Sequence, residues 1–329
     1  MPMELLRSSR RAVMVHALAA VVAGMACVGA AQAQEWPSRP VTLVVPYAPG
    51  ASNDLFTRAL ANVLSKRFNQ PFVVENRVGA GGFTGTNSVA KAAPDGYTYV
   101  EMPNSIAGFK PIMKVDLDPS VDLTPVGILA RSPIGMHVPA SLPVTTVKEF
   151  IDYAKANPDK VFYGMAGIGT TNHQHSEMFN MSAGLKIKGV NYKSAADVMT
   201  DLMAGRLQLM FSTTASTTPH IQSGKLRLLA YTDGNFPPTA IPAPTLAELG
   251  VPNMEKAQSW WAVFAPSGTP DDIKAKMNAA INDALKDPEF ADIIRKAGAT
   301  PSPATLEEAM ATVRQEIADV IEFAKTLEQ

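Results

Sequence analysis

Apolar residues fall into short continuous runs that alternate with helical stripes along most of the chain. Val41 to Val45 is a continuous apolar run, which is typical of a strand buried on both faces. From Phe56 to Leu64 the apolar positions recur at the spacing of one helical face. This first unit is therefore predicted as strand, turn and helix, and its repetition predicts an α/β fold with a parallel sheet.

The same alternation continues towards the C-terminus. Two S/T-x-x-E capping boxes, Thr146 to Glu149 and Thr305 to Glu308, mark helix starts, and Thr269 is expected to cap a helix that begins at Pro270. Two lobes joined by paired chain crossings near Ile134 and Ser259 are the simplest layout. Further strands are expected at 72–74, 97–102, 161–163, 187–191, 207–211, 226–231 and 260–265.

The N-terminus resembles a secretory leader. Arg7, Arg10 and Arg11 form a positive segment, an apolar run follows to Ala30, and 31–33 (Ala-Gln-Ala) is a small-x-small cleavage site. Residues 1–33 are therefore expected to be a signal peptide and the mature chain to be periplasmic. Twin-arginine export and lipidation of Cys27 are the alternatives.

Composition narrows the function classes. Loss of the leader removes the only cysteine, so the mature chain has no thiol for catalysis, clusters or disulfides. Loss of three arginines and Glu4 takes the formal net charge from −1 to −3. Without a long basic run, neither nucleic acid nor an anionic membrane surface is the expected partner.

Enzyme and cofactor motifs are mostly missing. The sequence has no G-x-S-x-G elbow, H-E-x-x-H pair or P-loop, and in the glycine-rich run 79–85 Thr84 replaces the third glycine of a dinucleotide fingerprint. His173 and His175 lie two apart on a predicted helix and cannot easily share a metal ion, so they are interpreted as helix-surface or pocket-edge residues. No metal, cofactor or catalytic residue is expected.

Two turns instead favour anion binding. Ala48 to Ser52 precedes the first helix, and Ala166 to Thr171 precedes a helix in the middle of the chain. Each turn should place free backbone N–H groups and the positive end of a helix dipole at one point, which suits a carboxylate. Ordinary βα connections are the alternative interpretation.

A family resemblance covers essentially the whole mature chain. The motifs VVPYAPGASND, VVENRVGAGG, AKAAPDGYT, YGMAGIGTTNH, VNYKSAADVMTDLMAGRLQLMF, GKLRLLAYT, APTLAELGVP and SWWAVFAPSGTP occur in that order. They resemble those of the substrate-binding proteins of tripartite tricarboxylate transporters, the TctC or Bug family. The resemblance implies a type II periplasmic-binding-protein fold, with two α/β lobes, a hinge and an enclosed ligand. It also implies two integral membrane partners. Together with the missing enzyme motifs, this predicts a monomeric receptor without catalytic activity.

On this resemblance, lobe 1 comprises 34–133 and 257–329, and lobe 2 comprises 134–256. The ligand-binding residues implied by the family loops, together with the hydroxyl and aromatic side chains expected to complete the cavity, are Tyr47, Ala48, Gly50, Ala51, Ser52, Phe83, Gly167, Gly169, Thr170, Thr171, Ser194, Ser212 and Thr213.

The chain departs from the family pattern at three places. Gly50 to Asn53 lacks the usual glycine cluster, Ser194 and Ala195 replace paired glycines, and Ser212 stands where many relatives have Asp. A buried ammonium group needs a carboxylate nearby, and Ser212 offers only a hydroxyl. A dicarboxylate or aromatic carboxylate is therefore expected rather than an amino acid, unless Asp54 or a distant acidic residue supplies the missing charge.

Two other classes stay open from the sequence. An exported hydrolase could use the same cleft with Ser52, Ser212 and His173, and a sensory binding protein could share every residue of the site.

The leader generates a direct prediction. We expect a mature N-terminus at Gln34, because the small-x-small site ends at Ala33. The intact mass of protein purified from the periplasm checks this. A mature chain that starts at an acylated Cys27 would contradict it.

Overall fold

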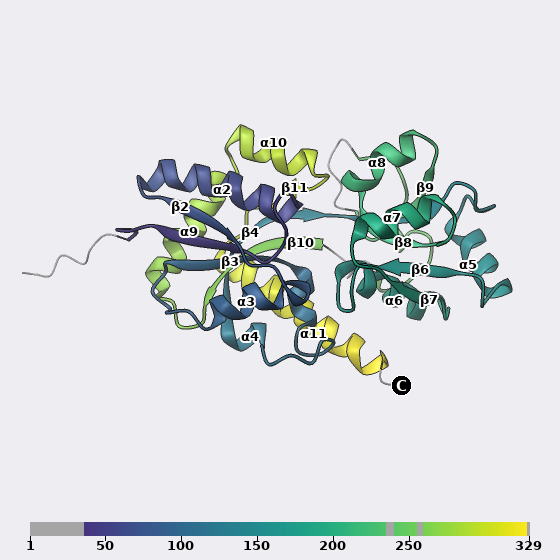
Figure 1. The fold of residues 1–329 in the computed structure, drawn as a ribbon, viewed down its shortest axis with the longest axis horizontal. Helices are drawn as coiled ribbons and strands as arrows, with labels where there is room; N and C mark the ends of the chain where they lie inside the picture. Colours follow the sequence, from purple (N-terminus) through teal and green to yellow (C-terminus); the bar gives the residue numbers. More distant parts are fainter. Residues whose placement is uncertain (1–35, 235–239, 255–258, 328–329) are drawn as a thin grey trace, which may run out of the picture. The chain divides into compact units, whose positions relative to one another are not determined.

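The computed structural model describes residues 36–234, 240–254 and 259–327, and the chain from Arg39 onward forms one compact unit (Figure 1). The expected leader lies outside the described residues, so its cleavage stays a prediction. No helix in the described ranges combines the length and apolar character that crossing a membrane requires.

The elements follow one another in the order β1 (Val41–Val45), α2 (Ser52–Phe68), β2 (Phe72–Asn76), η1 (Ala80–Gly82), α3 (Phe83–Ala90), β3 (Thr98–Pro103), η2 (Asn104–Gly108), α4 (Pro119–Asp122), β4 (Leu123–Ser132), β5 (Ile134–Pro139), α5 (Val147–Ala156), β6 (Phe162–Met165), α6 (Thr171–Ala183), β7 (Lys188–Asn191), α7 (Ala195–Met203), β8 (Met210–Thr213), α8 (Thr214–Gln222), β9 (Leu226–Tyr231), β10 (Ser259–Pro266), α9 (Asp271–Ala284), α10 (Pro288–Lys296), β11 (Thr300–Pro301) and α11 (Leu306–Leu327).

A six-stranded sheet with the order β11-β4-β10-β3-β1-β2 forms the larger core. Strands β2, β1 and β3 are parallel, as expected, whereas β10 is antiparallel to both β3 and β4. The expectation of a parallel sheet is therefore wrong for β10. Strand β4 carries the chain out of this sheet and β10 brings it back, so the two must run in opposite directions.

The middle of the chain forms a second α/β layer. Strands β8, β5 and β9 make a three-stranded antiparallel sheet, and β6 and β7 make a parallel pair. The chain passes from the first sheet to the second between Ser132 and Ile134 and rejoins the first at Ser259. The expected lobe boundaries at 133/134 and 256/257 stay predictions.

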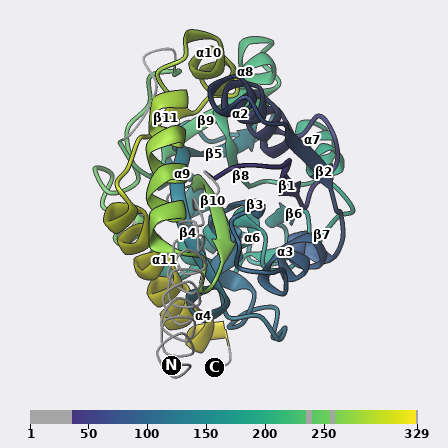
Figure 2. The same ribbon diagram turned by 90° about the vertical axis from the view of Figure 1, so that its left-hand side faces the viewer.

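Helices enclose both faces of the six-stranded sheet. Helices α2 and α10 lie side by side and α2 also contacts α9, whereas α3 and α11 share the core cluster of the opposite face (Figures 1 and 2). A separate cluster joins β5, α5, α6 and β9. The two sheets thus have separate apolar cores, joined by the β4–β5 and β10 crossings.

The structure contains the predicted cap at Thr146 but not the predicted cap at Thr269. The Thr146 capping box forms as predicted, with the Glu149 side chain accepting from the Thr146 N–H. The predicted cap at Thr269 is wrong: Pro270 is the N-cap of α9, and the Thr269 hydroxyl donates to the Pro266 carbonyl at 2.8 Å.

Candidate functional site

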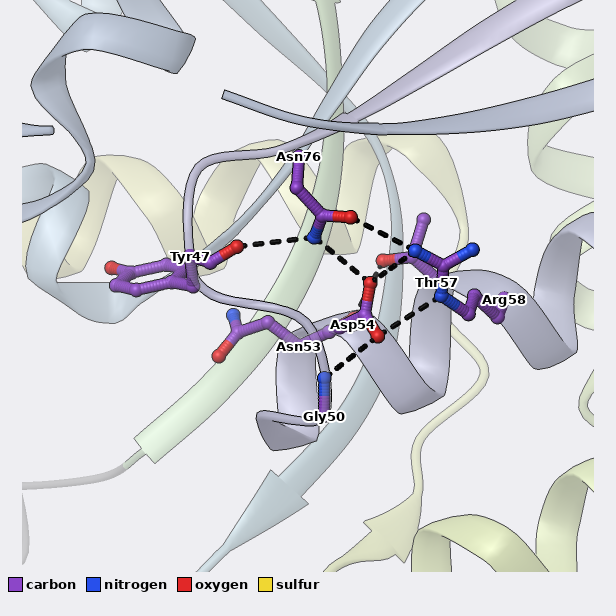
Figure 3. Close-up of polar contacts among 7 residues, drawn as sticks. All are labelled: Tyr47, Gly50, Asn53, Asp54, Thr57, Arg58 and Asn76. Carbon is purple, nitrogen blue, oxygen red and sulfur yellow. Dashed lines mark hydrogen bonds and ion pairs between the residues drawn. The ribbon is translucent and has the colours of Figure 1, made fainter. Parts of the chain in front are cut away.

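The turn between β1 and α2 is held by a carboxylate of its own chain (Figure 3). Asp54 accepts from the Gly50 N–H at 2.9 Å, from Asn76 Nδ2 at 2.9 Å and from Arg58 Nε at 3.0 Å. Asn76 Nδ2 also donates to the Tyr47 carbonyl at 3.1 Å. The expectation of a free amide is therefore wrong at Gly50, because Asp54 already occupies it.

Asp54 is a structural anion. Burial alone would raise its pKa, but the hydrogen bonds from Arg58, Gly50 and Asn76 outweigh burial and hold the pKa of Asp54 below its ordinary value. Its side chain is only 3% exposed and does not line the cavity described below. Asp54 is thus engaged within the turn and does not supply a partner for a ligand ammonium group.

The second turn, before α6, is braced by side chains of that helix. Gly169 N donates to His173 Nδ1 at 3.1 Å, and Gln174 Nε2 donates to the Gly169 carbonyl at 3.1 Å. Gly169 has φ +79°, and an added Cβ would lie 3.0 Å from Cγ of Met113. This turn therefore requires glycine and lies against residues of the first sheet's half of the molecule.

The two histidines of α6 are buried, contrary to the expectation of a helix surface. Burial lowers the pKa of His173, which keeps its imidazole neutral and able to accept from Gly169. His175 Nδ1 lies 2.5 Å from the Thr171 carbonyl. Among the described residues, no cluster of His, Cys, Asp and Glu has the makeup of a metal site.

A cavity of about 290 Å³ lies between residues of the two sheets. Its lining is mainly apolar with hydroxyl and amide groups, and comprises Tyr47, Asn53, Pro103, Ser105, Ile134, Ala166, Thr170, Thr171, Asn172, Ala195, Met210, Phe211, Ser212, Thr213, Ser259 and Trp261. Five predicted site residues belong to it: Tyr47, Thr170, Thr171, Ser212 and Thr213.

Four helices begin at this cavity. Asn53 is in the first turn of α2, Thr170 is the N-cap of α6, Ala195 is the first residue of α7, and Thr213 is the N-cap of α8. The starts of α2, α6 and α8 have no side-chain cap. First-turn N–H groups have no intrahelical partner, so these helix starts offer donors and the positive ends of dipoles to one space.

Among the described residues, no charged side chain lines the cavity. An acidic group is bonded directly to one lining residue. This group is Glu101 of β3, which is 1% exposed and accepts from Asn53 Nδ2 at 3.1 and 2.9 Å. Burial raises the pKa of Glu101 to about 8, and the Asn53 hydrogen bond lowers it only in part. At neutral pH the described part of the cavity wall therefore carries little net charge, apart from the helix dipoles.

Several predicted residues lie near the cavity without lining it, and their roles stay predictions. Phe83 packs edge-on against Phe109, with ring centroids 6.0 Å apart. The Ser194 hydroxyl caps α7 by accepting from Asp197 N, and the adjacent Ala195 lines the cavity instead. The other predicted residues outside the lining are Ala48, Gly50, Ala51, Ser52, Gly167 and Gly169.

Ser212 does not form the serine–histidine pair that a hydrolase would use. Its hydroxyl lies 3.0 Å from Ser216 Oγ, and His173 Nδ1 accepts from Gly169. The Tyr47 hydroxyl is similarly paired with Ser105 Oγ at 3.4 Å.

Other lining residues were missed by sequence reasoning. Ile134 and Ser259 mark the predicted chain crossings, and crossings between lobes border the space between them. That topological signal could have placed both residues in the site. Asn53 belongs to the family motif VVPYAPGASND, but its place in the lining was not predicted. Nothing local in the sequence indicates that Ser105, Asn172 or Trp261 lines a cavity.

Relatives and solved structures agree on the class of protein. The chain is 34% identical to Protein BugT of Bordetella pertussis over 289 residues, which cover 87% of this chain and 88% of that protein. Rpa4515 of R. palustris, solved with adipate, is 36% identical with a TM-score of 0.78, covering 89% of this chain and 98% of its own. MatC from Rhodopseudomonas palustris with bound malate is 27% identical with a TM-score of 0.75, covering 89% and 100%.

The fold, with its two α/β lobes, is that of a periplasmic binding protein. The model of the tripartite tricarboxylate transporter family receptor, TctC, matches residues 56–325. The chain belongs to this family of solute-binding receptors.

The Asp54 cluster generates a stability prediction. Asp54→Asn should lower the free energy of unfolding at pH 7 by about 2 kcal/mol, because hydrogen bonds to a buried charge are lost. The folded-state pKa of Asp54 is lowered, so its stabilisation is present above the unfolded pKa and is lost as pH falls through the folded pKa. Urea unfolding at pH 7 and at pH 3 should therefore show a smaller difference between wild type and variant in acid.

Asp152→Asn is the matched control. Asp152 forms an i,i+4 pair with Lys148, but its side chain is 61% exposed. An exposed pair of this kind contributes less than about 1 kcal/mol. Equal losses of unfolding free energy in Asp54→Asn and Asp152→Asn would contradict a structural role for Asp54.

Proposed function

We propose that this protein is a periplasmic receptor that captures a small organic carboxylate between its lobes and delivers it to the membrane subunits of a tripartite tricarboxylate transporter. The observation that carries the proposal is the convergence of four helix starts on a cavity whose described lining residues carry no charge. Helix N-termini hold anions through backbone N–H groups and dipoles, without a cationic side chain. The receptor acts as a monomer and performs no catalysis.

The ligand class we propose is a dicarboxylate or an aromatic carboxylate. Uncapped helix starts come from both halves of the molecule, so two anionic groups have separate places to bind. Phe211, Met210 and Trp261 give the lining an apolar stretch that suits a hydrocarbon or aromatic middle. The structures of relatives with adipate and with malate support the same class.

A ligand screen tests this proposal. Succinate, adipate, citrate, benzoate and terephthalate are compared with aspartate and glutamate by thermal shift, because a ligand that binds only the folded state raises its stability. We expect stabilisation by at least one of the five carboxylates and little by the amino acids. The reverse pattern would overturn the ligand class. Native mass spectrometry of protein taken from its host should identify a copurified carboxylate.

Ser212 generates a prediction about charge. Ser212→Asp should weaken dianion binding at least about tenfold, since a carboxylate added to this lining repels the ligand. Ser212→Asn is the matched control, because it has nearly the same size without the charge. Calorimetric titration with adipate should show a large loss for Asp and a smaller one for Asn. Equal losses of adipate affinity in the two variants would contradict the charge effect and indicate that Ser212 acts through shape alone.

A further inference from the structure

Asn53 occupies an unusual place, because one end of its amide faces a buried carboxyl group while the residue also lines the cavity. Its Nδ2 donates to both oxygens of Glu101, at 3.1 and 2.9 Å. Among the described residues, no side chain or backbone group donates to Asn53 Oδ1. In the structure, Nδ2 of the amide points to Glu101, which is the orientation that suits an ionised carboxylate. The acceptor Oδ1 is left for the cavity.

A side-chain amide can exchange these roles without changing its shape. Rotation by 180° about χ2 interchanges Oδ1 and Nδ2, which occupy almost the same space. A protonated Glu101 has an O–H that donates, so it would pair best with Oδ1 and turn Nδ2 towards the cavity. An ionised Glu101 accepts only, so it holds Nδ2 and leaves Oδ1 exposed to the ligand.

We propose that Asn53 is a ligand-contacting residue and that Glu101 sets which group it presents: a donor to the ligand carboxylate when Glu101 is protonated, and a repelling acceptor when Glu101 is ionised. This inference rests on the proposed carboxylate ligand. It assigns Glu101 a positioning role, since Glu101 is buried and acts through Asn53 alone.

The surroundings of Glu101 isolate it from other charges. Strands β1 and β10 and the elements α3 and η2, which contact β3, carry no titratable side chain. Helix α2 presents Asp54 and Arg58, which pair with each other at 2.9 Å. Tyr47 and Tyr99 are the other titratable groups on the described elements around Glu101: burial raises the pKa of both, and Glu101 raises that of Tyr47 further.

Glu101 can change state in an accessible range. Burial raises its pKa to about 8, so it is mostly protonated at pH 7 and ionised at pH 9.5. Carboxylate binding requires the protonated form in this scheme, and the proton leaves to water as pH rises. Affinity should therefore be constant below the pKa of Glu101 and fall above it.

The first arm of the test needs no ligand. Protein labelled with ¹⁵N-asparagine is titrated from pH 6 to pH 9.5, and the Asn53 side-chain amide signal is assigned by its loss in Asn53→Ala. We expect this signal to titrate in wild type and in Glu316→Gln, and to be constant in Glu101→Gln. Glu316 is the matched control, because it is a half-buried carboxyl group whose pKa is also raised but which bonds to Asn104 and Trp260. An Asn53 signal that is constant in wild type, or still titrates in Glu101→Gln, would overturn the inference.

The second arm measures adipate affinity by calorimetry. In wild type the Kd should rise on the order of tenfold from pH 7 to pH 9.5, and in Glu101→Gln it should stay within about twofold of the wild-type value at pH 7. Glutamine donates to Oδ1 as the protonated acid does. A wild-type Kd that is independent of pH, or a Glu101→Gln variant with the wild-type slope, would also overturn the inference. Absence of adipate binding at every pH would instead count against the proposed ligand class, while the amide titration still decides the coupling of Asn53 to Glu101.

Discussion

Every α-helix begins with backbone N–H groups that its own hydrogen-bond ladder cannot satisfy, and this constraint organises the cavity. Where the chain satisfies them itself, the turn becomes rigid. Ser194 accepts from Asp197 in the first turn of α7, and Asp54 of α2 reaches back to accept from Gly50, which precedes the N-cap Ala51. The remaining first-turn donors of α2, α6 and α8 have no side-chain cap and surround one space. The same geometry therefore both stabilises the turns and leaves a place for an anion.

Two carboxyl groups lie behind the cavity lining, the buried Glu101 on β3 and the half-buried Glu316 on α11. Glu101 bonds to Asn53, and Glu316 bonds to Asn104, whose Oδ1 accepts from Thr171 Oγ1 at 3.2 Å. Burial raises the pKa of Glu316 to about 7 and that of Glu101 to about 8. A raised folded-state pKa means that their stabilising contribution is complete below about pH 4.5 and diminishes as pH rises to the folded value. Glu101 is linked to the cavity through Asn53, and Glu316 through Asn104 and the lining residue Thr171.

The sequence predicted those strands whose local apolar pattern agrees with the pairing of strands that are distant in sequence. The run from Val41 to Val45 and the run from Leu226 to Tyr231 match β1 and β9 at both ends. Strands β4 and β5 were missed, because Pro125, Gly127 and Gly135 interrupt their apolar runs with residues that normally end a strand. Pro125 is tolerated because the pairing of β4 with β10 is irregular beside it. Hydrogen bonds between residues distant in sequence, such as Asn53 with Glu101, leave no periodic signal and could not be predicted.

Within the part of the lining that the structure describes, discrimination among ligands rests on the arrangement of donors and acceptors, since none of these residues is charged. A carboxylate loses its hydration in such a space but gains N–H donors at helix starts. An ammonium group loses its hydration as well, and the same dipoles oppose its charge. Ser212 offers one neutral hydroxyl, already 3.0 Å from Ser216, and Asp54 is held by Gly50, Arg58 and Asn76. For the proposed carboxylate ligand, the field of the helices is therefore what disfavours a zwitterion, and Ser212 adds no carboxylate that would offset that field.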